Sequence, residues 1–290
     1  MTPRSLLFVP GDRPERLEKA LASGADVIIL DLEDSVSAAN KAKARTDVLQ
    51  SLGVDRRGVK CFVRINPLSS EPASADLDAV MPGRPDGVVL PKAEGARSIA
   101  LLARHLDAAE QRHHIPPGET VILPIATETP AAIFKLGEYG GVTSRLMGLT
   151  WGAEDLPAAV GASAARESDG RYTPPLELAR SLALFGATAA GVAAIETVYP
   201  AFKDLDGLAT YAARGARDGF SGMMAIHPSQ VSIINAAFTP SDEQIAHAKA
   251  VVDAFAAQPG AGVVALDGAM LDAPHLAQAK RILARGAAKR

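Results

Sequence analysis

Eight short apolar runs alternate with longer alanine- and leucine-rich segments along most of this chain, and this alternation is the strongest constraint on its fold. The short runs are rich in β-branched residues, whereas the longer segments repeat their apolar residues at helical spacing. Strands that alternate with helices build βαβ units and a parallel sheet. The expected strands are residues 5–9, 26–31, 60–65, 87–90, 120–125, 145–149, 191–195 and 221–226. We therefore predict an α/β fold, namely a (β/α)₈ TIM barrel.

The chain continues beyond the eighth strand for longer than a barrel requires. We assign residues 1–240 to the barrel and residues 241–290 to a C-terminal helical extension of the same domain. Two helices are expected in this extension, at 242–257 and 274–284, separated by a glycine-rich segment at 260–268. We expect the extension to serve as a lid or as an oligomer contact.

Composition excludes several classes of protein. The 290 residues carry a net charge of −3 and no long basic run, so a nucleic-acid partner is not expected. No apolar run approaches the roughly 20 residues that span a bilayer, and the run at 6–9 is too short for a secretory signal. The single cysteine, Cys61, excludes an internal disulfide framework. We expect a cytoplasmic protein with no membrane partner.

Polar residues follow nearly every expected strand. In barrel enzymes the chemistry takes place at the C-terminal ends of the strands, because the loops there surround an open mouth. One polar residue after a strand is usually a helix cap or part of a solvated loop, but repetition over seven strands predicts an active site. The candidates are Asp31, Glu33, Asp34, Arg64, Asn66, Lys92, Glu128, Glu154, Asp155, Glu196 and His227.

The chemistry of these candidates favours a hard metal ion. Acids dominate, and only one histidine and no thiol pair are among them, so Mg²⁺ or Mn²⁺ is favoured over Zn²⁺. Glu128 and Asp155 follow consecutive strands and are the best pair of ligands. Each could instead cap a helix, because Pro130 and Pro157 follow closely. Spacing alone leaves both interpretations open.

Arg64 ends an apolar strand, where a guanidinium needs an anion to offset its desolvation. A substrate carboxylate would serve through paired hydrogen bonds, and an internal pair with Glu33 or Asp34 is the alternative. The loop at Gly152 and Ala153 offers backbone N–H groups that also suit a carboxylate.

Two further groups of residues could have either a functional or a purely structural role. Arg13, Arg16 and Lys19 place cations after the first strand, which is more often an ordinary solvated helix face. His227, followed by Pro228, is either a base or part of a capped turn, and the sequence favours the turn.

Eight motifs occur in an order that resembles the citrate lyase β-subunit-like family, which includes malyl-CoA and citramalyl-CoA lyases. They are residues 7–11 (Leu-Phe-Val-Pro-Gly), 31–34 (Asp-Leu-Glu-Asp), 64–66 (Arg-Ile-Asn), 90–92 (Leu-Pro-Lys), 128–129 (Glu-Thr), 152–156 (Gly-Ala-Glu-Asp-Leu), 226–230 (Ile-His-Pro-Ser-Gln) and 270–274 (Met-Leu-Asp-Ala-Pro). The resemblance covers essentially the whole chain. It implies a barrel that assembles as trimers or hexamers.

The resemblance also implies roles for individual residues. Residues that match Glu128 and Asp155 hold Mg²⁺, and the arginine that matches Arg64 holds the small acid. Asp272 matches an aspartate that a neighbouring subunit contributes to the site. The matches to residues that contact CoA are Phe8, Arg13 and Lys19. The chain departs from the family pattern at Met223, Glu196 and Thr129-Pro130, which bears on the substrate more than on the reaction class.

Together these expectations describe a Mg²⁺-dependent carbon–carbon lyase. It would cleave or condense a 3-hydroxyacyl-CoA, such as malyl-, citramalyl- or citryl-CoA, with a 2-oxo acid as one partner. Arg64 and the loop from Gly152 through Glu154 would hold the carboxylate, and Asp272 would exchange the proton of the thioester enolate. The residues expected to support this set are Asp31, Glu33, Asp34 and Lys92. The alternatives are a 4-hydroxy-2-oxo acid aldolase that uses no CoA, and a subunit that depends on an acyl-carrier partner.

Overall fold

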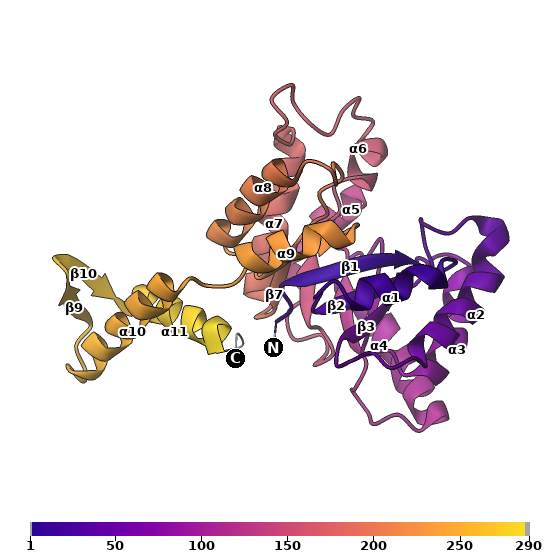
Figure 1. The fold of residues 1–290 in the computed structure, drawn as a ribbon, viewed down its shortest axis with the longest axis horizontal. Coiled ribbons are helices and arrows are strands. Elements are labelled where there is room, and N and C mark those ends of the chain that lie inside the picture. Colours follow the sequence, from indigo (N-terminus) through magenta and orange to yellow (C-terminus); the bar gives the residue numbers. More distant parts are fainter. Residues whose placement is uncertain (1, 288–290) are drawn as a thin grey trace. The chain divides into compact units, whose positions relative to one another are not determined.

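The computed structural model describes residues 2–287, and all eight expected strands are present (Figure 1). They are β1 (Ser5–Pro10), β2 (Val27–Asp31), β3 (Lys60–Arg64), β4 (Gly87–Leu90), β5 (Val121–Pro124), β6 (Gly148–Thr150), β7 (Ala193–Glu196) and β8 (Gly222–Ala225). The chain divides into two compact units, one of residues 3–235 and one that begins at residue 236. Each unit is described by itself.

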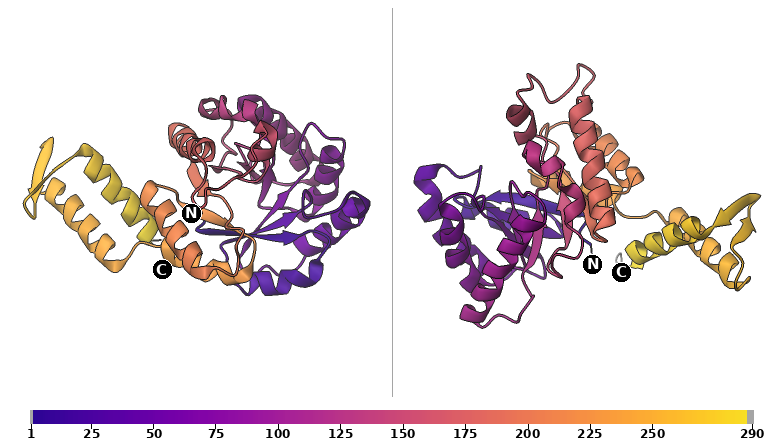
Figure 2. Two further views of the ribbon diagram at one scale, coloured as in Figure 1. Left: turned by 90° about the horizontal axis from the view of Figure 1, so that it is seen from above. Right: turned by 180° about the vertical axis from the view of Figure 1, so that it is seen from behind.

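The strands of the first unit form one parallel sheet that closes on itself. Their order is β5-β4-β3-β2-β1-β8-β7-β6, and every ladder between neighbours is parallel. The two ends of the sheet meet through parallel bridges between Ile122 and Leu146 and between Ile125 and Thr150. The helices lie outside the strands (Figure 2). The prediction of a (β/α)₈ barrel is therefore confirmed.

Helices connect successive strands, as a parallel sheet requires. From β1 to the boundary between the units they are α1 (Leu17–Leu21), α2 (Lys41–Leu52), α3 (Pro72–Val80), α4 (Ala96–His113), α5 (Pro130–Ile133), α6 (Asp155–Val160), α7 (Pro174–Ala189), α8 (Leu205–Asp218) and α9 (Pro228–Ala237), whose last two residues lie beyond that boundary. Short 3₁₀ turns are η1 (Pro14–Arg16), η2 (Ala38–Asn40), η3 (Met81–Gly83) and η4 (Leu136–Glu138). No helix among residues 2–287 is long and apolar enough to cross a membrane.

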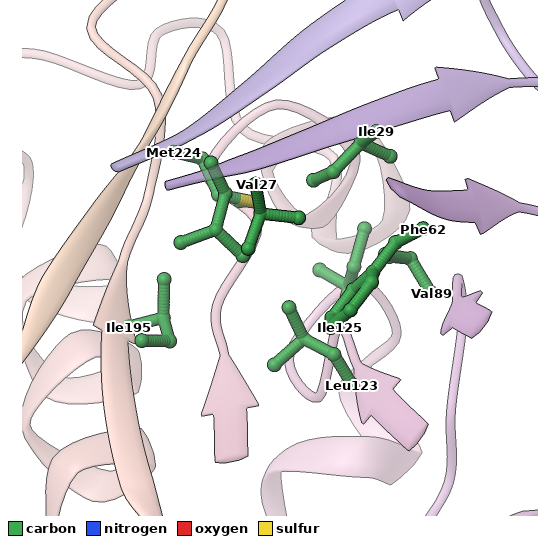
Figure 3. Close-up of a cluster of buried hydrophobic side chains, with 9 residues drawn as sticks. Val27, Ile29, Phe62, Val89, Leu123, Ile125, Ile195 and Met224 are labelled. Carbon is green, nitrogen blue, oxygen red and sulfur yellow. The ribbon is translucent and has the colours of Figure 1, made fainter. Parts of the chain in front are cut away.

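The barrel interior is filled by alternate residues of the strands. A cluster of nine buried side chains lies there (Figure 3), and its members are Leu6, Val27, Ile29, Phe62, Val89, Leu123, Ile125, Ile195 and Met224. Successive strand residues point to opposite faces, so the row formed by Val27 and Ile29 continues to Asp31 at the end of β2. Arg64 pairs in register with Asp31 from the neighbouring strand. The same periodicity that builds the core thus places two charges at the barrel mouth.

The turn after β1 depends on a glycine. The N–H of Gly11 donates to the carbonyl of Asp31 at 2.8 Å. A Cβ at this position would lie only 2.5 Å from that carbonyl oxygen and 2.9 Å from the side chain of Val48. The close approach requires Gly11, and it fixes the loop after β1 beside the end of β2.

The C-terminal unit consists of α10 (Asp242–Ala256), the strands β9 (Val263–Leu266) and β10 (Ala269–Asp272), and α11 (Ala273–Ala287). The two predicted helices are present, but the segment expected to separate them contains an antiparallel hairpin. Asp267 and Gly268 form its two-residue turn, both with positive φ, which is the conformation that an Asp-Gly pair favours. Ala248, Val251, Val264, Leu271 and Ala279 form the buried cluster of this unit.

Candidate active site

A cavity of about 600 Å³ lies at the C-terminal end of the barrel, within the size range of small-molecule sites. Its wall is formed by residues at or after the ends of β1, β2, β3, β5, β6, β7 and β8. Arg64, Glu128 and Asp155 are among them. The sequence prediction that polar residues from many strands meet at one rim therefore holds for these three side chains.

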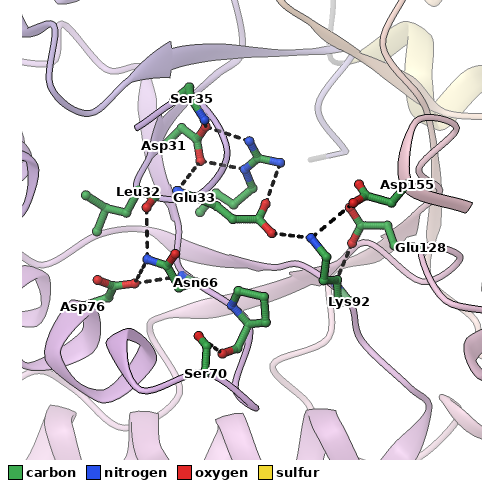
Figure 4. A network of polar contacts seen from close by, with 12 residues as sticks. Asp31, Leu32, Glu33, Ser35, Asn66, Ser70, Asp76, Lys92, Glu128 and Asp155 are labelled. Atoms are coloured by element: carbon green, nitrogen blue, oxygen red, sulfur yellow. Dashed lines mark hydrogen bonds and ion pairs between the residues drawn. The ribbon is translucent and has the colours of Figure 1, made fainter. Parts of the chain in front are cut away.

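Arg64 is held by two carboxylates rather than left free. Its Nε donates to Asp31 Oδ1 and its Nη2 donates to Asp31 Oδ2, each at 2.6 Å (Figure 4). Its Nη1 lies 2.9 Å from Glu33 Oε2. The guanidinium carbon is 4.8 Å from the centre of the Phe8 ring. The expected internal pair of Arg64 is thus present with Glu33, but the hydrogen bonds go to Asp31, which the sequence did not indicate as a partner.

Arg64 also lines the cavity, and the two hydrogen bonds to Asp31 use two of the five N–H donors of its guanidinium, while Nη1 makes only an ion-pair contact with Glu33. Burial opposes ionisation of Asp31, but the hydrogen bonds and charge of Arg64 outweigh it and lower the pKa of Asp31. Burial likewise opposes the charge on Arg64, yet its carboxylate partners raise the pKa of the guanidinium. Both groups are therefore ionised, and Arg64 keeps donors for an anion in the cavity.

The ion pairs continue from Arg64 toward the other side of the barrel mouth. Glu33, only 4% exposed, accepts a hydrogen bond from Lys92 Nζ at 2.8 Å. The same Nζ lies 3.4 Å from Asp155 Oδ1 (Figure 4). Burial raises the pKa of Glu33 despite the nearby cations. Asp31, Arg64, Glu33, Lys92 and Asp155 thus form a row of alternating charges.

Glu128 is buried at the end of this row. Its Oε2 accepts a hydrogen bond of 2.5 Å from the backbone N–H of Lys92, and its side chain is packed against Gly152, where a Cβ would lie 2.8 Å from Glu128 Cγ. Burial, together with the negative charges of Glu33 and Asp155, raises the pKa of Glu128 to about 8. An uncompensated carboxylate of this kind is stabilised by a nearby cation.

Neither predicted metal ligand is used as a helix cap. Thr129, not Glu128, caps α5, because its hydroxyl accepts a hydrogen bond from the N–H of Ala132. Asp155 is the first residue of α6, whose N-cap is Glu154, and the cap makes no side-chain hydrogen bond there. Glu128 and Asp155 both line the cavity. Their carboxylates are available to a ligand in it.

The charges around the two acids suit a divalent cation. When all are ionised, four carboxylates and two cations leave two negative charges; these groups are Asp31, Glu33, Glu128, Asp155, Arg64 and Lys92. Within residues 2–287 there is no group of three or more His, Cys, Asp or Glu side chains arranged to hold a metal. Mg²⁺ commonly uses only one or two protein carboxylates and fills its remaining positions with water and substrate oxygens. The donor set fits Mg²⁺ or Mn²⁺.

The remaining predicted binding residues are not all at the cavity. Phe8, Lys19, Gly152, Ala153 and Glu154 line it. So does the exposed side chain of Asp34.

Arg13 does not line the cavity; its side chain is 58% exposed and lies 4.0 Å from Asp12. Arg16, which the sequence offers only as one of several surface cations, does line the cavity. Arg16 lies three residues before Lys19, and this spacing places two residues on the same face of a helix. The spacing is therefore the sequence signal for a shared position at the cavity.

Two rim candidates have structural roles. Glu196 is fully buried and does not line the cavity; it bonds to Trp151, Arg180 and Tyr211. The interpretation of Glu196 as a rim group is therefore wrong, because side chains alternate along a strand and Thr197, the next residue, lines the cavity instead. His227 lines the cavity but pairs with Ser229 at 2.7 Å, as the expected capped turn requires.

Asp272 belongs to the C-terminal unit, at the end of β10. Its side chain is 51% exposed, and its Oδ1 lies 2.6 Å from Nδ1 of His275. The structure describes this unit by itself, so the contribution of Asp272 to an active site stays a prediction.

Comparison with known proteins agrees with this geometry. The citrate lyase subunit beta-like protein of Mycobacterium tuberculosis is 36% identical over 279 residues, which cover 96% of this chain and 94% of the relative. The (3S)-malyl-CoA thioesterase of Cereibacter sphaeroides is 32% identical over 293 residues, which cover 98% and 95%.

A solved structure of M. tuberculosis CitE, in complex with magnesium, acetoacetate and coenzyme A, is 35% identical to this chain. It superposes with a TM-score of 0.80, covering 99% of this chain and 98% of the other. The family model described as HpcH/HpaI aldolase/citrate lyase matches residues 4–228. The chain therefore belongs to the HpcH/HpaI aldolase/citrate lyase family.

Proposed function

We propose that this chain is a magnesium-dependent carbon–carbon lyase that acts on a 3-hydroxyacyl thioester of CoA, such as a malyl, citramalyl or citryl group. The products are an acyl-CoA and a 2-oxo acid, and the reaction is reversible. The observation that carries this proposal is the cavity wall on which Glu128, Asp155 and Arg64 lie together. It supplies two metal ligands and one anion-binding group in a single space.

Glu128 and Asp155 are the residues that hold Mg²⁺ in this proposal, and Mn²⁺ is an acceptable substitute. When bound, the metal polarises substrate oxygens and lowers the pKa of a hydroxyl that binds it. Arg64 uses its remaining N–H donors to hold the carboxylate of the 2-oxo acid. Backbone N–H groups of the loop from Gly152 through Glu154 support the same carboxylate.

The thioester end of the substrate extends along the side of the cavity where Phe8 and Lys19 lie. Lys19 and Arg16 provide positive charge for the phosphates of CoA, and the exposed Arg13 adds to it further out. The coenzyme A in the solved M. tuberculosis relative supports a CoA thioester as the substrate class.

Asp272 completes the proposed site from a neighbouring subunit of a homotrimer or hexamer. Its exposed carboxylate would protonate the enolate carbon during cleavage and remove that proton during condensation, a contribution typically worth about 10²–10⁴-fold. The unpaired, buried Cys61 agrees with a reducing compartment, so we place the reaction in the cytoplasm.

A second candidate is a lyase subunit that receives its thioester on an acyl-carrier partner. The name of the M. tuberculosis relative, a citrate lyase subunit beta-like protein, favours this alternative. Both candidates use the same metal and carboxylate chemistry. They differ in whether free CoA esters are turned over by the isolated chain.

The experiment is a substrate panel with the purified protein and Mg²⁺. It contains malyl-, citramalyl- and citryl-CoA, the matching acyl-carrier thioesters, and a 4-hydroxy-2-oxo acid without CoA, and it measures the released 2-oxo acid and acyl thioester. We expect turnover of a CoA ester that EDTA abolishes and Mg²⁺ restores. Turnover of the CoA-free acid alone would instead identify an aldolase, and full activity in EDTA without tightly bound metal would contradict the metal role.

A further inference from the structure

Lys92 contacts both carboxylates of the proposed metal site, and it uses two different parts of the residue to do so. Its backbone N–H donates to Glu128 Oε2 at 2.5 Å, while its Nζ lies 3.4 Å from Asp155 Oδ1 (Figure 4). Glu128 follows β5 and Asp155 follows β6, whereas Lys92 follows β4. One residue thus links the loops after three strands.

The backbone of Lys92 is held in a costly conformation. Its φ is 51°, in the left-handed region that residues with a Cβ rarely adopt. Such a conformation persists where the surrounding contacts enforce it, and here it accompanies the hydrogen bond to Glu128. Glycine would adopt this backbone at no steric cost, so a lysine here is best explained if its ammonium has a task of its own.

The ammonium is anchored on the side opposite Asp155. It lies 2.8 Å from Glu33 Oε1, and the other oxygen of Glu33 lies 2.9 Å from Arg64 Nη1. Glu33 is 4% exposed, whereas the Asp155 side chain is 34% exposed. The fixed partner can therefore orient the freer one. The negative charge of Glu33 also offsets the repulsion that the ammonium would exert on a bound cation.

We propose that Lys92 is the positioning residue of the metal site. Its N–H orients Glu128, and its ammonium, anchored on Glu33, orients Asp155. This inference rests on the proposed function, which assigns the metal to those two acids. Groups that orient metal ligands through hydrogen bonds typically change metal affinity or activity by about 10–100-fold when they are removed.

The chain offers a selective way to remove and restore the ammonium. Its single cysteine, Cys61, is 1% exposed, and burial raises the pKa of its thiol to about 11, so it resists alkylation at neutral pH. Lys92 is 31% exposed, so Lys92→Cys places one accessible thiol at this position. Alkylation with 2-bromoethylamine then rebuilds a side chain of lysine length with its ammonium, and iodoacetamide adds a neutral group of similar size.

The measured quantity is Mn²⁺ affinity, determined by electron paramagnetic resonance in the absence of substrate. We expect Lys92→Cys to bind Mn²⁺ about 10–100-fold more weakly than wild type. Aminoethylation should restore most of the affinity, and carboxamidomethylation should not. Lys92→Gly keeps the left-handed backbone and its N–H but loses the ammonium, so it should be as weak as Lys92→Cys.

His114→Gly is the matched control, because His114 is exposed and has a φ of 54°. It should bind Mn²⁺ like wild type, and circular dichroism should show every variant folded. Wild-type affinity in Lys92→Gly, or equal recovery with the two reagents, would overturn the inference while leaving the metal site in place. Absence of Mn²⁺ binding in wild type would overturn the proposed function, and the inference with it.

Discussion

The barrel unit and the C-terminal unit hold their charged groups in different ways. In the barrel, Arg145 and Glu110 are 4% and 1% exposed and lie against each other. In the C-terminal unit, Asp272 and His275 form a pair in which both side chains are about half exposed. Breaking a buried pair leaves an isolated buried charge, whereas an exposed pair contributes little because water replaces the lost partner. Arg145 and Glu110 are therefore fixed charges of the barrel, which also has exposed pairs such as Arg112 and Asp78.

The proposed site needs both kinds of group. Metal ligands must keep one geometry, and the row of charges from Asp31 to Asp155, with Glu128 beside it, lies at or after the ends of barrel strands. A proton carrier must instead reach the reacting carbon and stay able to change its protonation. Exposed Asp272 suits that role better than a carboxylate locked in a buried pair. In the proposed function, metal binding belongs to the barrel and proton transfer to the C-terminal unit, and each role can be tested separately.

The largest effect is expected from Glu128→Gln, which keeps the shape of the side chain but removes its charge. Losing a metal ligand forfeits several kcal/mol of transition-state stabilisation, so kcat/KM should fall by about 10⁴-fold or more. Mn²⁺ binding should weaken in parallel. Glu94→Gln is the control, because Glu94 pairs with Lys135 and does not line the cavity. Equal losses in both variants would remove Glu128 from the metal site.

Asp272→Asn, unlike Glu128→Gln, should lower activity without weakening Mn²⁺ binding. We expect kcat to fall by about 10²–10⁴-fold while Mn²⁺ affinity stays at the wild-type value, because the lost group transfers a proton and does not hold the metal. The control is Asp267→Asn in the hairpin turn, where asparagine also tolerates the positive φ of 51°. A parallel loss of Mn²⁺ affinity would contradict the separation of roles.

Mixing the two inactive variants tests whether Asp272 acts on a neighbouring subunit. Glu128→Gln and Asp272→Asn are unfolded together and reassembled in equal amounts. In a closed ring of like interfaces, about one quarter of the sites then combine an intact barrel with an intact C-terminal unit. Activity should return toward that fraction. Activity that stays at the level of the separate variants, in proven hetero-oligomers, would place Asp272 at the site of its own chain or at none.

Much of the barrel could be predicted from sequence because its strands are buried on both faces. Such strands are continuous apolar runs, and their carboxyl ends are marked by the first charged residue, as at Asp31 and Arg64. The hairpin after α10 is harder to predict, because Gly260, Gly262 and Gly268 suggest a loop, although Asp267-Gly268 is a recognised hairpin turn.

The sequence indicates which residues lie at the candidate site better than it indicates which partners they contact. The lyase class and the magnesium cofactor are confirmed at the level of the family and its solved relatives. The partner of Arg64 required the strand register, which sets Asp31 beside it, and Glu196 was misplaced because sequence does not show which face of a strand is the interior. The substrate depends on side-chain positions in loops, which no periodicity determines.

The ionisation of Glu110 should make the stability of the barrel unit depend on pH. Burial opposes the ionisation of Glu110, but hydrogen bonds from Arg145, Thr120 and Gly118 outweigh it and lower the pKa to about 2. Its ionised form therefore stabilises the barrel above about pH 4.5, and this contribution is lost as the pH falls toward 2. Glu110→Gln removes one partner of a buried ion pair and should lower the stability of the barrel by about 3 kcal/mol at neutral pH. The cost should not be larger, because Asp107 still accompanies Arg145.

The measurement is urea unfolding of wild type and Glu110→Gln between pH 7 and pH 3. The stability difference between them should shrink as the pH is lowered, because wild type progressively loses the same interaction. Glu119→Gln is the control, since Glu119 is an exposed acid on the neighbouring loop. A difference that stays constant with pH would show that the substitution acts through packing and not through charge.

The smallest effect is expected at the start of α10. Ser241 caps this helix: its hydroxyl accepts a hydrogen bond from the N–H of Gln244, whose side chain in turn accepts one from the N–H of Ser241. Removing the hydroxyl in Ser241→Ala should cost about 1 kcal/mol, whereas Ser241→Asp retains an acceptor and should cost little. The relevant observable is hydrogen exchange of the amides in α10, because the loss concerns one helix end in a unit with a small core.

We expect α10 amides to exchange about fivefold faster in Ser241→Ala, the rate equivalent of 1 kcal/mol, with β2 and β3 unchanged. That pattern would show that the C-terminal unit opens independently of the barrel. Equal acceleration in the barrel strands would show that both units open in one cooperative step. The contrast between a rigid barrel and an independent C-terminal unit would then fail, even if every catalytic assignment were correct.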